Sequence, residues 1–167
     1  MPFRIRQFEK RDFELLWQID QVCFDPHLAY SRPELAYYMR RPSAFTLVAE
    51  SEASGTVKEP MKYQHSPARP SRILGFIVAE NRKQAGHIIT IDVIEEARRL
   101  GVGSALLGAA ERQLQDSGAV AVELETAVNN DAAIRFYKQR GYFVEGTVRG
   151  YYSNQLDALV MRKALTE

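Results

Sequence analysis

A turn with two glycines, placed between a predicted strand and a predicted helix, constrains the fold of this chain more than any other feature. Residues 87–93 are rich in isoleucine and β-branched side chains, which is typical of a central strand. Residues 102–114 carry apolar side chains at helical spacing. The segment between them is Arg98-Arg99-Leu100-Gly101-Val102-Gly103-Ser104. Because the first N–H groups of the helix are left unpaired after such a turn, the pattern predicts an α/β chain with a place for an anion.

The remaining elements predict one mixed sheet. Alternating or β-branched side chains predict strands over residues 3–8, 44–50, 73–80, 120–126, 142–149 and 156–162. Helical spacing, with a capping box at Ser31 and Glu34, predicts helices over residues 13–22, 31–40 and 130–140. The order β-α-α-β-β-β-α-β-α-β-β predicts an α/β (α+β) fold with a mixed, largely antiparallel sheet flanked by helices.

The length of 167 residues predicts a single domain over 1–167. Residues 51–72 hold three prolines and one glycine among polar side chains. This composition predicts a long mobile loop, inserted at the tip of a hairpin because neither side could form a core alone.

Composition limits the kinds of binding partner and the cell compartment that we expect for this chain. A formal net charge of +1 gives no overall attraction to nucleic acid or to an anionic membrane. The polar start of the chain does not suit a signal peptide, and no run approaches the roughly 18 apolar residues of a membrane span. Cys23, the single cysteine, is interpreted as a small buried hydrophobe in a reducing compartment. We therefore expect a cytoplasmic monomer or homodimer with no nucleic-acid or membrane partner.

Metal binding is not expected. The three histidines are scattered along the chain without the spacing of metal ligands. They are His27, His65 and His87.

The turn alone leaves two interpretations open. Its glycines would let the backbone approach a ligand closely, and Arg98 and Arg99 add positive charge, which suits a pyrophosphate. A tight strand-to-helix turn without a ligand would use the same glycines. The turn lacks the Gly-Lys-[Ser/Thr] ending of a P-loop, and Leu106 stands where a dinucleotide fingerprint would place its third glycine.

Two segments together resemble the GCN5-related N-acetyltransferases. The pattern Arg98-x-x-Gly101-x-Gly103 resembles the coenzyme A pyrophosphate motif of that family. Residues 130–142 resemble its Asn-x-x-Ala-x-x-x-Tyr-x-x-x-Gly-[Phe/Tyr] segment, at a fitting distance from the first. The resemblance spans most of the chain and is strongest over residues 89–165. Within the family the chain is most similar to the RimI group, the ribosomal-protein alanine N-acetyltransferases.

The resemblance implies that acetyl-CoA is the cosubstrate. It also implies that the fourth and fifth strands splay apart to admit the thioester. The backbone of Ile91, Asp92 and Val93 is expected to hold the pantetheine and the acetyl carbonyl, where an N–H would stabilise an oxyanion. The pyrophosphate and the coenzyme A arm are assigned to Arg98, Arg99, Leu100, Gly101, Val102, Gly103, Ser104 and Asn130.

Two catalytic residues follow from the same resemblance. An α-amine has a pKa of about 7.7–8.0 and a lysine about 10.4, so a base must help to supply the neutral amine. Glu125 is expected to be that base, directly or through a water, although Glu123 shares its face by strand parity. Tyr137 is expected to donate a proton to the departing thiolate, the alternative being a core aromatic beside Phe136.

The acceptor side is less well determined. Tyr30, Tyr151 and Tyr152 are candidate acceptor-site residues, but adjacent tyrosines in a strand point to opposite faces, so one of the last two would only pack. Asp92 stands where the RimI group has a small apolar residue. Its role is left open between a second base and a partner for a cationic substrate.

Three functions stay open. The first is acetylation of a protein N-terminus, ribosomal or otherwise. The second is acetylation of a small amine or a lysine side chain, because acceptor choice depends on loops. The third is a non-catalytic acetyl-CoA-binding regulatory module, against which the presence of both Glu125 and Tyr137 argues.

Overall fold

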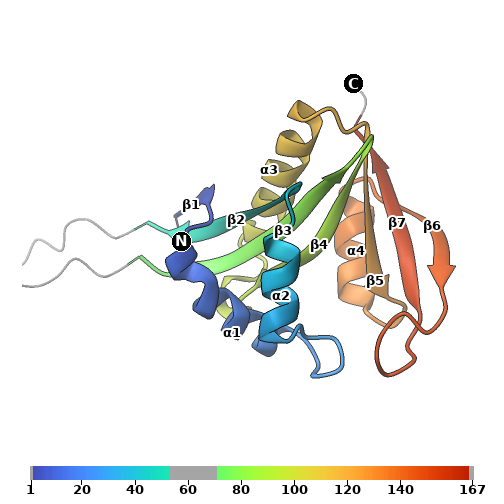
Figure 1. Cartoon of the computed structure of the whole chain (residues 1–167), viewed down its shortest axis with the longest axis horizontal. Coiled ribbons are helices and arrows are strands. Elements are labelled where there is room, and N and C mark those ends of the chain that lie inside the picture. The colour runs from blue at the N-terminus through green and yellow to red at the C-terminus, as the bar shows by residue number, and fades with distance from the viewer. Residues whose placement is uncertain (1, 53–70, 166–167) are drawn as a thin grey trace, which may run out of the picture.

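The computed structural model describes residues 2–52 and 71–165 (Figure 1). The predicted mobile loop over residues 51–72, and His65 within it, therefore lie almost wholly outside the described residues. The strands on either side pair antiparallel, from Ala44 opposite Glu80 to Glu50 opposite Ile73.

Seven strands form one sheet in the order β1-β2-β3-β4-β5-β7-β6. The strands are β1 (Phe3–Gln7), β2 (Ala44–Ser51), β3 (Ile73–Arg82), β4 (Ala85–Val93), β5 (Ala121–Ala127), β6 (Phe143–Val148) and β7 (Ala158–Ala164). The helices are α1 (Phe13–Cys23), α2 (Arg32–Met39), α3 (Val102–Asp116) and α4 (Asp131–Gln139), with short 3₁₀ turns η1 (Lys10–Asp12) and η2 (Glu95–Ala97). Neighbouring strands pair antiparallel except β4 and β5, which are parallel. The predicted fold class and element order are confirmed.

The sheet has a core on each face because successive side chains of its strands alternate. On one face, α1 and α2 bury Leu16 and Leu35 against Phe76 of β3. On the other, α3 buries Leu106 against a cluster that includes Ile77, the next residue of β3. Each fully buried side chain of this size stabilises the fold by about 1.5–3 kcal/mol.

The capping box predicted before α2 is present. The Ser31 side chain accepts a hydrogen bond from the Glu34 N–H at 3.3 Å, and the Glu34 carboxylate accepts from the Ser31 N–H at 2.7 Å. These bonds satisfy donors that would otherwise be unpaired at the start of α2. They fix the helix start, and with it the end of the α1–α2 connection.

The parallel pair β4–β5 separates along its length. It runs from Ala85 opposite Ala121 to Ile88 opposite Leu124 and ends there. Beyond this point β4 stays paired with β3 up to Val93, whereas β5 stays paired with β7. Figure 1 shows the two strands meeting at one end and diverging toward the other. The predicted splay between the fourth and fifth strands is confirmed.

Candidate active site

A cleft of about 950 Å³ lies where β4 and β5 separate. Its walls come from these two strands, the N-terminus of α3, the face of α4 and the α1–α2 connection. It brings together most of the residues predicted from the sequence: Tyr30, Ile91, Asp92, Val93, Arg98, Arg99, Gly101, Gly103, Ser104, Glu125, Asn130, Tyr137 and Tyr152. The predicted residues that do not line it are Leu100, Val102 and Tyr151. The Val102 side chain is fully buried in the core, so only its backbone can serve a ligand.

The glycines of the turn before α3 have separate structural reasons. Gly101, the residue before the first turn of α3, has φ +86°, a left-handed conformation that strains any residue with a side chain. At Gly103 an added Cβ would lie 3.3 Å from the ring of Phe136 on α4. The turn therefore brings α3 and α4 close together and exposes the N–H end of α3 to the cleft. This arrangement fits an extended pyrophosphate.

Arg140, which the sequence analysis did not select, adds positive charge to the same end of α3. Its Nε donates to Ser104 Oγ at 2.9 Å, and its Nη1 donates to the Phe136 carbonyl at 2.9 Å. Its guanidinium also lies 3.9 Å from the centre of the Phe136 ring. The signal available in the sequence was the spacing of four residues between Phe136 and Arg140, which places both on one side of a helix.

Glu125 and Glu123, which the sequence could not separate, have different surroundings. Glu125 lines the cleft, and its Oε2 lies 2.6 Å from Nε2 of His87 on β4. Glu123 forms an ion pair with Arg162 of β7 and does not line the cleft. Whenever Glu125 is ionised, its carboxylate can only accept, and the donor in this contact is then the Nε2–H of His87. Glu125 is thus a carboxylate in the cleft wall held by a histidine.

Tyr137 is both a packed aromatic and part of the cleft wall. Its ring packs edge-on against Phe136 at 5.2 Å and Tyr142 at 5.6 Å, and the side chain is 7% exposed. It also lines the cleft. Burial, followed by the negative charge of Asp92, raises the pKa of the Tyr137 hydroxyl, so it keeps its proton throughout the range in which an α-amine becomes neutral.

Two connections flank the far end of the cleft. The α1–α2 connection and the β6–β7 connection are joined by a hydrogen bond from Ser153 Oγ to the His27 carbonyl at 2.8 Å. Tyr30 lies in the first of them, and its hydroxyl is 3.4 Å from the Ile89 carbonyl of β4. The two connections lie side by side in Figure 1.

The expectation that Tyr151 and Tyr152 belong to a strand is wrong. β6 ends at Val148 and β7 begins at Ala158, so both tyrosines lie in the β6–β7 connection. Their rings pack edge-on at 4.9 Å. Only Tyr152 lines the cleft, which makes Tyr151 the packing partner.

Asn130 caps α4, since its side chain accepts a hydrogen bond from the Ala133 N–H at 3.1 Å. It also lines the cleft. Its predicted contact with the coenzyme A arm stays a prediction.

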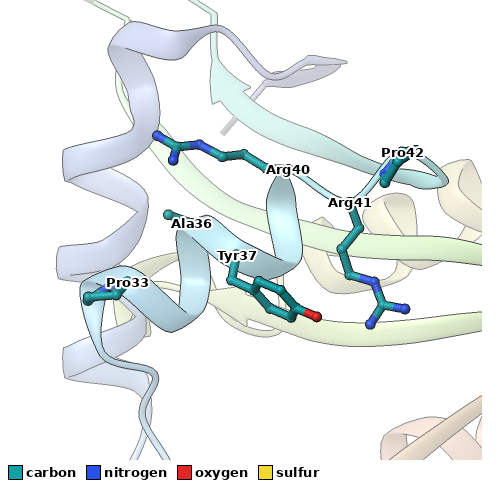
Figure 2. A pocket seen from close by; sticks show the side chains of 6 residues that line it. All are labelled: Pro33, Ala36, Tyr37, Arg40, Arg41 and Pro42. Carbon is teal, nitrogen blue, oxygen red and sulfur yellow. The ribbon is translucent and has the colours of Figure 1, made fainter.

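A second hollow, of about 580 Å³, lies along α2 and the residues that follow it (Figure 2). Tyr37 and Arg41 line it, and the guanidinium of Arg41 lies 6.0 Å from the tyrosine ring centre. Arg41 is already paired with the buried carboxylate of Glu80 at 3.0 Å. We give this hollow no part in the site.

Residues 2–52 and 71–165 also bear on metal binding and on membrane insertion. Over these ranges, no three His, Cys, Asp or Glu side chains gather in a way that could hold a metal ion. In the same part of the chain, no helix is long and apolar enough to cross a membrane.

The acetyltransferase (GNAT) family model matches residues 13–142, which include the turn before α3, the splayed strands and α4. The chain belongs to the acetyltransferase (GNAT) family. Membership confirms the predicted family, and with it the acetyltransferase class. It also supports reading the turn before α3 as a pyrophosphate site.

This GNAT chain is similar to a protein from Sulfurisphaera tokodaii named N-alpha-acetyltransferase, with 40% identity over 81 residues. The match covers 48% of this chain and 48% of the relative. The chain thus spans about half the length of this curated relative.

Two solved structures share its fold. The structure of Ard1 from Thermoplasma volcanium superposes with a TM-score of 0.81 at 27% identity, covering 100% of both chains. The ribosomal-protein-S18-alanine N-acetyltransferase from Escherichia coli superposes with a TM-score of 0.76 at 19% identity, covering 99% of this chain and 95% of the other. At that identity the second likeness shows the fold alone. The finer resemblance to the RimI group therefore stays a prediction.

Proposed function

We propose that this GNAT chain transfers the acetyl group of acetyl-CoA to the N-terminal α-amine of proteins. The observation that carries the proposal is the Glu125–His87 pair in the wall of the cleft, 2.6 Å apart at the point where β4 and β5 separate. The name of the Sulfurisphaera relative, N-alpha-acetyltransferase, supports the same acceptor.

The pKa of the amine that must lose a proton favours an α-amine as acceptor. A lysine amine must be deprotonated from a pKa about 2.5 units higher than that of an α-amine, which costs about 3.4 kcal/mol more at neutral pH. A carboxylate held by one histidine suits the easier of the two tasks. The acceptor would enter between the α1–α2 and β6–β7 connections, past Tyr30 and Tyr152.

In this proposal Glu125 and Tyr137 each carry out one of the two proton transfers. Bound acetyl-CoA supplies an activated acetyl thioester. Glu125, directly or through a water, takes the proton that the amine loses as its nitrogen bonds to the acetyl carbon. Tyr137 gives a proton to the sulfur as the carbon–sulfur bond breaks, and a backbone N–H of residues 91–93 stabilises the negative charge that develops on the acetyl oxygen.

The same proposal assigns cofactor binding to the N-terminus of α3. The N–H groups after Gly101 would bind the pyrophosphate, helped by the charges of Arg98, Arg99 and Arg140, all of which line the cleft. Arg98 is partly committed, because its Nε already donates to the Val93 carbonyl at 3.1 Å.

We extend the proposal to cytoplasmic N-termini, those of ribosomal proteins among them. A direct test uses peptides that begin with Ala, Ser or Met, with polyamines and free amino acids alongside, and follows release of coenzyme A. We expect release with one or more of the peptides. Release with polyamines alone would overturn the acceptor, and no release with any amine would favour a binding module.

A further inference from the structure

Two acidic side chains that the proposed reaction does not use are buried together beneath the cleft. Asp20 of α1 is fully buried, and Asp92 of β4 is 2% exposed. One oxygen of each carboxyl is satisfied by the protein. Asp20 Oδ2 accepts from the Tyr30 N–H at 2.8 Å, and Asp92 Oδ1 accepts from the Thr90 hydroxyl at 2.8 Å.

The second oxygen of each carboxyl has no such donor. Asp20 Oδ1 and Asp92 Oδ2 are buried and have no hydrogen-bond donor within residues 2–52 and 71–165. Each carboxyl also shifts the pKa of the other, through a hydrogen bond between the two side chains. Two ionised carboxylates buried together in this way would repel each other, and both would lack solvation. One proton between them converts the repulsion into a hydrogen bond.

The surroundings do not offer enough positive charge to hold both acids ionised. The titratable groups that face the pair are Cys23 of α1, Tyr30 of the α1–α2 connection, Arg98 after η2 and Tyr137 of α4. Arg98 is the one cation among them. Burial, and then the charge of Asp20, raises the pKa of Asp92 well above its ordinary value, and burial raises the pKa of Asp20.

We propose that Asp20 and Asp92 share one proton, and that this hydrogen bond positions both substrates of the acetyl transfer. Asp92 lies between Ile91 and Val93, on the length of β4 that has no partner on its β5 side. Asp20 holds the backbone of Tyr30 on the acceptor side. The pair therefore joins the strand proposed to hold the thioester to the connection proposed to receive the amine.

The shared proton also limits negative charge where the reaction creates more of it. If both carboxyls were ionised, their charge would oppose the negative charge that develops on the acetyl oxygen beside the backbone of residues 91–93. This resolves the two roles left open for Asp92: it is a positioning residue rather than a second base or a partner for a cationic substrate. The inference rests on the proposed binding of acetyl-CoA along β4.

The first test does not involve acetyl-CoA, so its failure is distinct from failure of the proposed function. An ordinary Asp loses its proton near pH 3.9 in the unfolded chain, whereas the folded pair keeps one proton to higher pH. Between about pH 3.9 and the pH at which the folded pair loses its proton, the wild-type free energy of unfolding therefore falls as pH rises. An amide in place of either acid supplies a hydrogen that does not titrate, and removes this fall.

Thermal unfolding is measured against pH for wild type, Asp20→Asn and Asp92→Asn, with Asp116→Asn as the control because Asp116 is exposed at the end of α3. We expect the melting temperature of each pair variant, relative to wild type, to rise with pH from about pH 3.9 to the pH at which the folded pair loses its shared proton. The control should show a constant difference. A pH-independent difference for Asp20→Asn and Asp92→Asn would overturn the shared proton.

The second test separates positioning from structural support. Asp20→Asn can still accept from the Tyr30 N–H and donate to Asp92, so the KM values for acetyl-CoA and acceptor should stay within about twofold of wild type. Asp20→Ala should raise both by about five- to tenfold, the loss expected for one hydrogen bond. If Asp20→Ala does not fold, the comparison of Asp20→Asn with wild type at alkaline pH decides: the variant should keep its KM where that of wild type rises. Parallel KM curves would contradict the inference.

Discussion

His87 Nε2 on β4 lies 2.6 Å from Glu125 Oε2 on β5, across the last part of the parallel pair before the strands separate. The strand register places His87 opposite Glu123. Its side chain nevertheless contacts the carboxylate of Glu125, two residues further along β5 on the same face. Glu123 is held instead by Arg162. The relationship selects one of two equivalent carboxylates and places it in the cleft wall.

Replacing Glu125 by Gln should lower kcat by about 10²–10⁴-fold, the usual contribution of a general base, with the steepest loss at low pH where the amine is protonated. Glu123→Gln is the matched control, because it removes a carboxylate from the same face outside the cleft. Steady-state kinetics over a range of pH decide. A wild-type pH profile in Glu125→Gln, or a larger loss in Glu123→Gln, would assign the base elsewhere.

Tyr137→Phe should lower kcat and leave the melting temperature almost unchanged, since the ring packing is kept and only the hydroxyl is lost. Tyr142→Phe is the control with the opposite expectation. It removes a hydrogen bond to Glu111 Oε1 at 3.0 Å, away from the cleft, and should cost about 1 kcal/mol of stability without changing kcat. Unchanged turnover in Tyr137→Phe would show that Tyr137 is not the general acid.

Gly101→Ala should weaken acetyl-CoA binding. Alanine in the left-handed conformation at φ +86° costs about 1–2 kcal/mol, which the turn would relieve by moving its N–H groups. Gly108→Ala, inside α3, meets only the end of the Arg112 side chain at 3.4 Å and should stabilise the helix by about 0.5–1 kcal/mol. Calorimetric titration with acetyl-CoA measures the affinity of each variant. Equal affinities in the two variants would show that the turn does not bind the pyrophosphate.

Stability in acid should depend on Glu50, at the edge formed by β1 and β2. Burial acts to raise its pKa, but hydrogen bonds from Ser71, Arg4 and Arg6 bring the pKa of Glu50 down to about 2. The carboxylate therefore stabilises the fold above its ordinary pKa of 4.5, and this contribution is lost as pH falls toward 2.

Glu50→Gln should flatten the acid side of the curve of melting temperature against pH, whereas Glu52→Gln, at an exposed position, should not. The same acid loss in wild type and Glu50→Gln would show that the ion pairs of Glu50 do not contribute.

The elements of the fold follow from local signals in the sequence. Alternation predicts β1 and β5, and the capping box at Ser31 and Glu34 predicts the start of α2. The predicted strands over residues 142–149 and 156–162 already left residues 150–155 as a connection, so the alternation of strand side chains did not apply to Tyr151 and Tyr152.

The pairs that build the site could not be predicted in the same way. His87 and Glu125 are 38 residues apart, and Ser104 and Arg140 are 36 apart. No periodicity connects such residues. They meet only because β4, β5, α3 and α4 converge at one point, which is a property of the tertiary packing.

The central claim is that the acceptor is an N-terminal α-amine. It is tested most directly by the ratio of kcat/KM for two forms of one lysine-containing peptide, with its N-terminus free or chemically blocked, and tandem mass spectrometry locates the acetyl group. Blocking the N-terminus should abolish turnover, and the free peptide should be acetylated at its first residue. Equal turnover of the two forms, with the acetyl group on the lysine side chain, would contradict it.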